Sequence, residues 1–173
     1  MGKIAAIVLA AGEASRFGSP KQQLLLPRVL EQLGQTSVDN VVVVKGAHEL
    51  VVLLDHPAAR VVPCREWERG PGASLRCGLT ALGSDVEAAV VVLADGPNLS
   101  PQAVERVLDD WRAHGRVAAA SYDDARGHPL VIGREDWAEI PDEGLHERPV
   151  RLVPCDDLGS PGDIDRPEDL ESL

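Results

Sequence analysis

Apolar runs rich in β-branched residues alternate along the chain with stretches that repeat apolar positions at helical spacing. The runs are typical of buried strands, and they lie at residues 4–9, 41–44, 60–63, 88–93, 117–121, 129–132 and 150–153. The amphipathic stretches predict helices at residues 27–33, 48–54 and 74–82, a helix from Pro101 capped by Ser100, and a short helix from Pro167.

This β-α alternation predicts one domain over residues 1–173, because no repeat, low-complexity tract or long linker divides the chain. The expected fold class is α/β with a mainly parallel sheet. Ligands of such sheets bind beyond the carboxyl ends of the strands. Two loops leave such ends, one after Leu9 and one after Leu93, and both are candidate sites of chemistry.

The loop after the first strand, with Leu9 included, reads LAAGEASRFGSPK and ends at Lys21. Small residues at Ala10, Ala11 and Gly12 let a ligand approach the backbone, whose N–H groups can hold phosphate oxygens. Arg16 and Lys21 then supply positive charge where a phosphoryl group develops negative charge. The spacing fits neither a Walker A loop nor GxGxxG. A tight strand-to-helix connection with solvated charges is the other interpretation of this loop.

Net charge and cysteine content indicate which partners and which cellular compartment to expect. The net charge of −11 disfavours a nucleic-acid partner, and it requires any phosphate-handling cleft to gather basic residues and a divalent cation locally. Three widely spaced cysteines without CxxC predict a reduced, cytoplasmic protein rather than a disulfide framework. The first apolar run is too short for a secretory signal or a membrane span, so no membrane partner is expected.

Carboxylates stand at two further places where chemistry is plausible. Asp95 follows the buried run at 88–93, where it can either hold Mg²⁺ or begin a turn in Asp-Gly-Pro. Asp163 and Asp165 alternate near the end of the chain, so an extended backbone would place both on one face. Asp165 can bind the cation, cap the helix from Pro167, or do both.

The loop LAAGEASRFGSPK resembles the LAAGxSxRxGxxK loop of the molybdenum-cofactor cytidylyltransferase and guanylyltransferase (MobA-like) families. The resemblance implies a three-layer α/β/α fold of the nucleotide-diphospho-sugar transferase-like, Rossmann-like kind. It also implies that Leu9 and the Ala10–Gly12 turn border the nucleotide base, while Arg16 and Lys21 act on its phosphates as catalytic residues. The Ala-Ala-Gly form of the turn is similar to that of the CTP-using members.

Four shorter segments extend the resemblance over nearly the whole chain. The segment LADGP resembles Leu-x-Asp-x-Pro, and DIDRPEDL resembles DIDTPEDL, which implies metal ligands at Asp95 and Asp165 and an acceptor contact at Asp163. The segment GASLRCGL resembles GxSLRxGL, which implies that Gly72 and Ser74 lie near the nucleotide at a helix N-terminus, a good place for an anion. Gly-His-Pro implies that His128 approaches the acceptor, although a histidine before proline is also an ordinary turn residue.

The chain departs from the family pattern in two places. The connection after Lys21 is abbreviated, and residues 141–148 (PDEGLHER) lack a leading glycine and move an arginine of the family's acceptor-bordering segment. The nucleotide half of the site is therefore better supported than the acceptor half.

The function implied is a Mg²⁺-dependent nucleotidyltransferase that moves a nucleoside monophosphate from an NTP, CTP favoured, to a phosphorylated acceptor and releases pyrophosphate. Molybdopterin is the favoured acceptor, with a molybdoenzyme or maturation factor as a protein partner. The alternatives are GTP as donor, a sugar phosphate or phospholactate as acceptor, and a non-catalytic cofactor carrier with the same fold.

Overall fold

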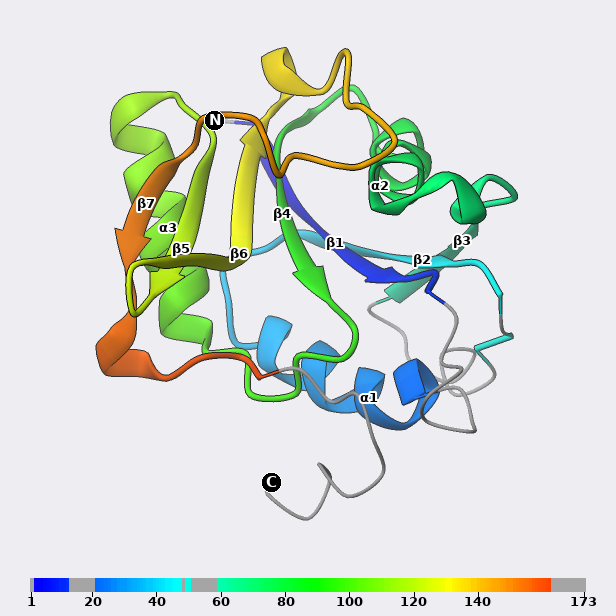
Figure 1. Cartoon of the computed structure of the whole chain (residues 1–173), viewed down its shortest axis with the longest axis horizontal. Coiled ribbons are helices and arrows are strands. Elements are labelled where there is room, and N and C mark those ends of the chain that lie inside the picture. The colour runs from blue at the N-terminus through cyan, green and yellow to red at the C-terminus, as the bar shows by residue number, and fades with distance from the viewer. Residues whose placement is uncertain (1, 13–20, 48, 51–58, 163–173) are drawn as a thin grey trace.

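A computed structural model describes residues 2–12, 21–47, 49–50 and 59–162 (Figure 1). These residues form a seven-stranded sheet in the order β3-β2-β1-β4-β6-β5-β7. The strands are β1 (Lys3–Ala10), β2 (Asn40–Lys45), β3 (Ala59–Pro63), β4 (Val86–Leu93), β5 (Ala118–Tyr122), β6 (Ala125–Gly133) and β7 (Arg151–Pro154). The seven predicted runs all appear in the sheet, with bounds that shift by a few residues.

The sheet is mainly parallel, as predicted. β3, β2, β1 and β4 run in the same direction, and β7 runs parallel to β5. β6 is antiparallel to both of its neighbours, β4 and β5. This reversal matters for the site, because it brings the first residues of β6 beside the carboxyl end of β4.

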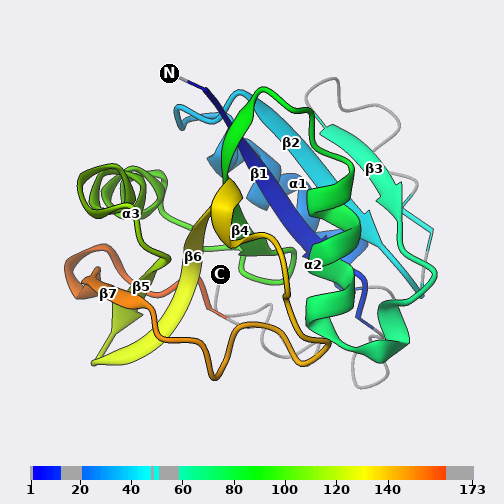
Figure 2. The same cartoon turned by 90° about the horizontal axis from the view of Figure 1, so that it is seen from above.

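Helices cover both faces of the sheet, which confirms the three-layer α/β/α arrangement (Figure 2). They are α1 (Lys21–Leu33), α2 (Pro71–Thr80) and α3 (Pro101–His114), with short 3-10 turns at η2 (Trp67–Arg69), η3 (Arg134–Asp136) and η4 (Asp156–Leu158). Successive side chains of β1 feed opposite cores: Val8 packs with α1 and α3, while Ile7 packs with α2. None of the described helices is long and apolar enough to cross a bilayer.

The first helix is longer than predicted. The sequence pattern placed it at residues 27–33, whereas α1 begins at Lys21 and carries Pro27 in its interior. Proline removes one helical hydrogen bond. Packing outweighs that loss, because the helix buries one continuous apolar face formed by Leu25, Leu26, Val29, Leu30 and Leu33.

The later helices follow the sequence more closely. The α3 N-terminus is as predicted, since the Ser100 hydroxyl accepts a hydrogen bond from the Ala103 N–H at 3.3 Å. α2 begins at Pro71, three residues before its predicted start at Ser74. Most of the helix predicted at 48–54, and the one predicted from Pro167, lie outside the described residues.

A disulfide contradicts the prediction that the cysteines are reduced. Cys64, which follows β3, is bonded to Cys77 of α2, and their Cα atoms are 5.7 Å apart. Cys155 is free and buried. The pair could not be predicted, because its members are 13 residues apart without a recognisable spacing and meet only after α2 packs beside β3.

Reduction of this disulfide is expected to lower the free energy of unfolding by about 3 kcal/mol, the value for a closed loop of this size. Denaturant unfolding with and without a phosphine reductant measures the effect. The double variant Cys64→Ser/Cys77→Ser is the control, since its unfolding should not respond to the reductant. An identical midpoint for the oxidised and reduced wild-type protein would contradict the pairing.

Candidate active site

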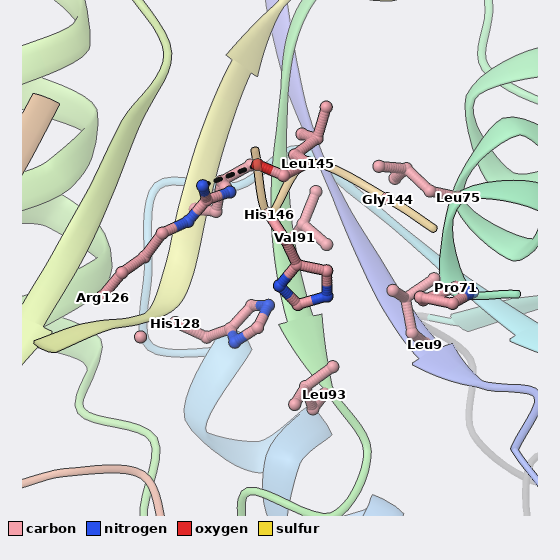
Figure 3. A pocket seen from close by; sticks show the side chains of 12 residues that line it. Leu9, Pro71, Leu75, Val91, Leu93, Arg126, His128, Gly144, Leu145 and His146 are labelled. Atoms are coloured by element: carbon pink, nitrogen blue, oxygen red, sulfur yellow. Dashed lines mark hydrogen bonds between the residues drawn. The ribbon is translucent and has the colours of Figure 1, made fainter. Parts of the chain in front are cut away.

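A cavity of about 460 Å³ lies at the carboxyl ends of β1 and β4 (Figure 3). Leu9 and Leu93, the residues that close these two predicted strands, form part of its wall. The remaining lining comes from β4, α2, β6 and a segment that follows η3, namely Val91, Pro71, Leu75, Arg126, Gly127, His128, Leu130, Gly144, Leu145 and His146. The cavity therefore lies where an α/β sheet is expected to bind its ligand.

Asp95 lies next to this cavity, in the turn that ends β4. The Ala94 N–H donates to the Leu9 carbonyl oxygen at 3.1 Å, so the turn is joined to the end of β1, from which the predicted phosphate loop departs. The Gly96 N–H closes the turn on the Leu93 carbonyl oxygen at 3.3 Å. Asp95 therefore lies in a turn, one of its two predicted roles. It also places a half-buried carboxylate beside the predicted site of phosphate binding.

The C-terminal motif approaches the same turn. A smaller cavity of about 260 Å³ shares Leu93 and His128 with the first and is also lined by residues 160–162. The Asn98 N–H donates to the Pro161 carbonyl oxygen at 2.9 Å, which fastens this segment beside the Asp95 turn. Asp163 and Asp165 follow directly, but they lie outside the described residues.

The carboxylate of Asp95 fits a magnesium ion better than a structural transition-metal site. Among the described residues, no group of three His, Cys, Asp or Glu side chains is placed to hold a metal. Mg²⁺ characteristically binds one or two carboxylates and completes its shell with water and substrate phosphates. A single carboxylate beside the predicted phosphate loop is consistent with that donor set.

Of the predicted nucleotide loop, the structure describes residues 9–12 and the backbone of Lys21. Ala10 and Ala11 are buried at the end of β1, and Leu9 reaches the cavity. Arg16 and the side chain of Lys21 lie outside the described residues, and the backbone of Lys21 begins α1. The nucleotide contacts of these residues stay a prediction.

Gly72 and Ser74, the two predicted nucleotide contacts on α2, lie in surroundings that the sequence did not indicate. The Gly72 N–H donates to the Asp142 carbonyl oxygen at 2.8 Å, and a Cβ atom at position 72 would overlap the Pro141 carbonyl oxygen. Ser74 lies in the first turn of α2 and its side chain is buried. Gly72 is therefore required for the close packing of residues 141–144 on α2, and a nucleotide contact at either residue stays a prediction.

His128 contributes an uncharged imidazole to the cavity. Burial lowers the pKa of His128 to about 4, and the neighbouring Arg126 and His146 act in the same direction, whereas Asp95 opposes the shift. At neutral pH the ring can therefore donate and accept hydrogen bonds but carries no positive charge. Its predicted approach to the acceptor is untested, although its place in the cavity wall suits that role (Figure 3).

Arg126 and His146 were not predicted as site residues. Arg126 donates from Nη1 to the Leu145 carbonyl oxygen at 2.7 Å, the contact drawn in Figure 3. Strand alternation could have indicated Arg126, because residues 126, 128 and 130 share one face of β6 and all line the cavity. His146 comes from a segment without regular structure, and its place depends on long-range contacts.

The chain is similar to known proteins over most of its length. The sequence model of the MobA-like NTP transferase domain matches residues 6–153. The bifunctional protein GlmU of Exiguobacterium sp. AT1b is 29% identical over an alignment of 143 positions, which covers 76% of this chain and 32% of GlmU. The chain thus spans about a third of the length of the curated relatives it matches.

Solved structures show the same fold. Rv0371c from Mycobacterium tuberculosis H37Rv superposes with a TM-score of 0.83 at 27% identity, over 99% of this chain and 97% of that one. A complex of Rv0371c with manganese superposes with a TM-score of 0.75 over the same shares of the two chains. These similarities confirm the predicted nucleotide-diphospho-sugar transferase-like fold. Because the domain match covers most of the sequence, the chain belongs to the MobA-like NTP transferase family.

Proposed function

We propose that the protein transfers CMP from CTP to a phosphorylated acceptor, molybdopterin carrying its metal, and releases pyrophosphate. The observation that carries this proposal is the position of the large apolar cavity directly beside the Asp95 turn and the end of β1. A nucleotide held by the phosphate loop and an acceptor held in the cavity would meet at that edge.

The nucleotide half rests on the loop after β1. We assign the base to the Ala10–Gly12 turn, whose Ala-Ala-Gly form favours CTP, and the phosphates to Arg16 and Lys21. Asp95 and Asp165 would hold Mg²⁺, which when bound neutralises charge on the phosphates. The manganese complex of Rv0371c supports a divalent cation in this fold family.

The proposed reaction needs no protein base. An oxygen of the acceptor phosphate attacks the α-phosphorus of CTP, forms the new P–O bond, and expels pyrophosphate from the opposite side. The phosphate nucleophile is already ionised near neutral pH. Lys21 and Arg16 would stabilise the charge on the transferred and leaving phosphates, so catalysis consists of positioning and electrostatic stabilisation.

The lining of the cavity favours a flat, largely uncharged ring over a sugar. Its described residues provide three polar side chains, Arg126, His128 and His146, among mostly aliphatic neighbours. A sugar phosphate presents many hydroxyls, and each hydroxyl left without a partner in such a wall would cost binding free energy. A pterin presents an extended planar face that can pack on aliphatic side chains, and its polar groups lie along the rim of the ring, where a few polar side chains can reach them. A cavity of about 460 Å³ lies within the range of small-molecule sites.

A thermal-shift screen of the four NTPs with Mg²⁺, followed by a pyrophosphate-release assay with CTP and molybdopterin, tests the proposal. A nucleotide at 100 times its Kd should add about 2.7 kcal/mol of stability, which raises Tm by several degrees. CTP is expected to give the largest shift. A larger shift with GTP would reverse the donor assignment, and no shift with any NTP would favour the carrier alternative.

A further inference from the structure

The segment 140–146 forms one wall of the cavity, and we call it the acceptor wall. It contributes Gly144, Leu145 and His146 to the lining. It also overlaps residues 141–148, where the sequence departs from the family pattern. In Figure 2 the chain after η3 crosses in front of β4 and reaches the N-terminus of α2.

One end of the acceptor wall is fastened to α2. Arg76 donates from Nη1 to the Ile140 carbonyl oxygen at 2.5 Å, and its other terminal nitrogen pairs with the Asp142 carboxylate. Arg69 pairs with the second oxygen of the same carboxylate at 3.1 Å. The hydrogen bond from Arg76 holds the pKa of Asp142 below its ordinary value, with a further contribution from Arg69, so the carboxylate is charged and the clamp is ionic.

The other end of the acceptor wall is fastened to β6. The hydrogen bond from Arg126 to the Leu145 carbonyl oxygen fixes the backbone there, and the side chains of Ile140 and Leu145 are buried in the core beneath α2. His146 follows the second anchor directly, and its exposed side chain points toward the cavity (Figure 3). The wall is therefore held at two places and adds one polar side chain, that of His146, to the lining of the cavity.

We propose that Arg76 is a positioning residue that sets the acceptor wall, and that His146 contacts the ring of the acceptor and helps to select it. This inference rests on the proposed function and deepens it. Arg76 acts through Ile140 and Asp142, since it does not itself line the cavity. Its loss would free the α2 end of the wall and widen the acceptor half of the site. Asp95 and the end of β1 do not depend on this clamp.

Separate binding measurements with a neutral pterin and with CTP test the acceptor half and the nucleotide half of the site independently. The probe is 6-hydroxymethylpterin, followed by its fluorescence, and CTP with Mg²⁺ is titrated separately. The variants are His146→Ala, Arg76→Ala and the double variant, with Arg106→Ala as the matched control. Arg106 also pairs with a carboxylate, that of Asp157 at 2.7 Å, but it lies on α3 and does not line the cavity.

Both single variants are expected to weaken pterin binding about tenfold, the loss that accompanies removal of one favourable polar contact or of its support. The Kd for CTP should stay within about twofold, and Arg106→Ala should bind both ligands like the wild type. The double variant should be no weaker than Arg76→Ala alone, because His146 loses its position once the wall is released. Amide hydrogen exchange should rise at residues 140–146 in Arg76→Ala only.

Three results would overturn the inference: an unchanged pterin Kd in Arg76→Ala, an equal loss of pterin and CTP binding in that variant, or no pterin binding by the wild type. In the last case, CTP binding shows whether the nucleotide half of the proposed function stands. Pterin binding without any NTP binding would instead refute the transferase proposal and leave the wall assigned. If Arg76→Ala does not fold, Asp142→Asn removes the same ion pair from the other side.

Discussion

Asp95→Asn is expected to abolish the magnesium-dependent stabilisation by CTP and to lower nucleotidyl transfer by at least 10²-fold, on the scale of losing one preorganised electrostatic group. The substitution keeps the size and shape of the side chain while it removes the negative charge that a hard cation requires. The turn after β4 should survive, because it is closed by backbone bonds of Ala94 and Gly96. CTP thermal shifts with Mg²⁺ and with EDTA, together with pyrophosphate release, measure the loss.

A matched control for this substitution is Asp109→Asn. Asp109 is an exposed residue of α3 that pairs with Arg112 at 3.1 Å and lies away from the cavity. It should retain both the CTP shift and the transfer rate, because an exposed ion pair contributes little. Equal CTP shifts with and without Mg²⁺ in Asp95→Asn and in the wild type would remove Asp95 from the metal site.

Local signals in the sequence were enough for most of the fold. The strand at 88–93 was evident from its apolar run, and the start of α3 from Ser100 followed by Pro101. These features depend on neighbours within a few residues. The longer α1 was missed because the proline signal at Pro27 is local, whereas the burial of Leu25 and Leu26 that overrides it comes from the sheet.

The residues of the candidate site also differ in whether a local sequence signal indicates them. The positions of Leu9 and Asp95 near the cavity were predictable because each lies at the end of a recognisable strand. Their roles, which the resemblance implies, stay predictions. The clamp of Arg76 on Asp142, which are 66 residues apart, has no local signature. Gly72 was read as an open helix terminus for an anion, yet its N–H is taken by the acceptor wall. Contacts of this kind follow from tertiary packing, so the acceptor half could not be derived from spacing alone.

Lys21→Ala is expected to lower the rate of nucleotidyl transfer on the order of 10²–10³-fold, the cost of removing one preorganised donor from a developing charge. The net charge of −11 makes this cation more important, because little general attraction draws an NTP to the molecule. Single-turnover rates at saturating CTP separate the chemical step from binding. Lys21→Arg should recover part of the rate, since it restores the charge with a different geometry.

The matched lysine for this test is Lys3, which lies at the amino end of β1, the end opposite the cavity. Its ammonium group pairs with Asp85 at 2.7 Å, and both side chains are exposed. Lys3→Ala removes the same charge from the molecule, so it reports any effect of net charge alone on the binding of CTP. Full turnover by Lys21→Ala would exclude Lys21 from catalysis, whereas equal losses in the two variants would attribute the effect to the global field and not to a contact with the phosphates.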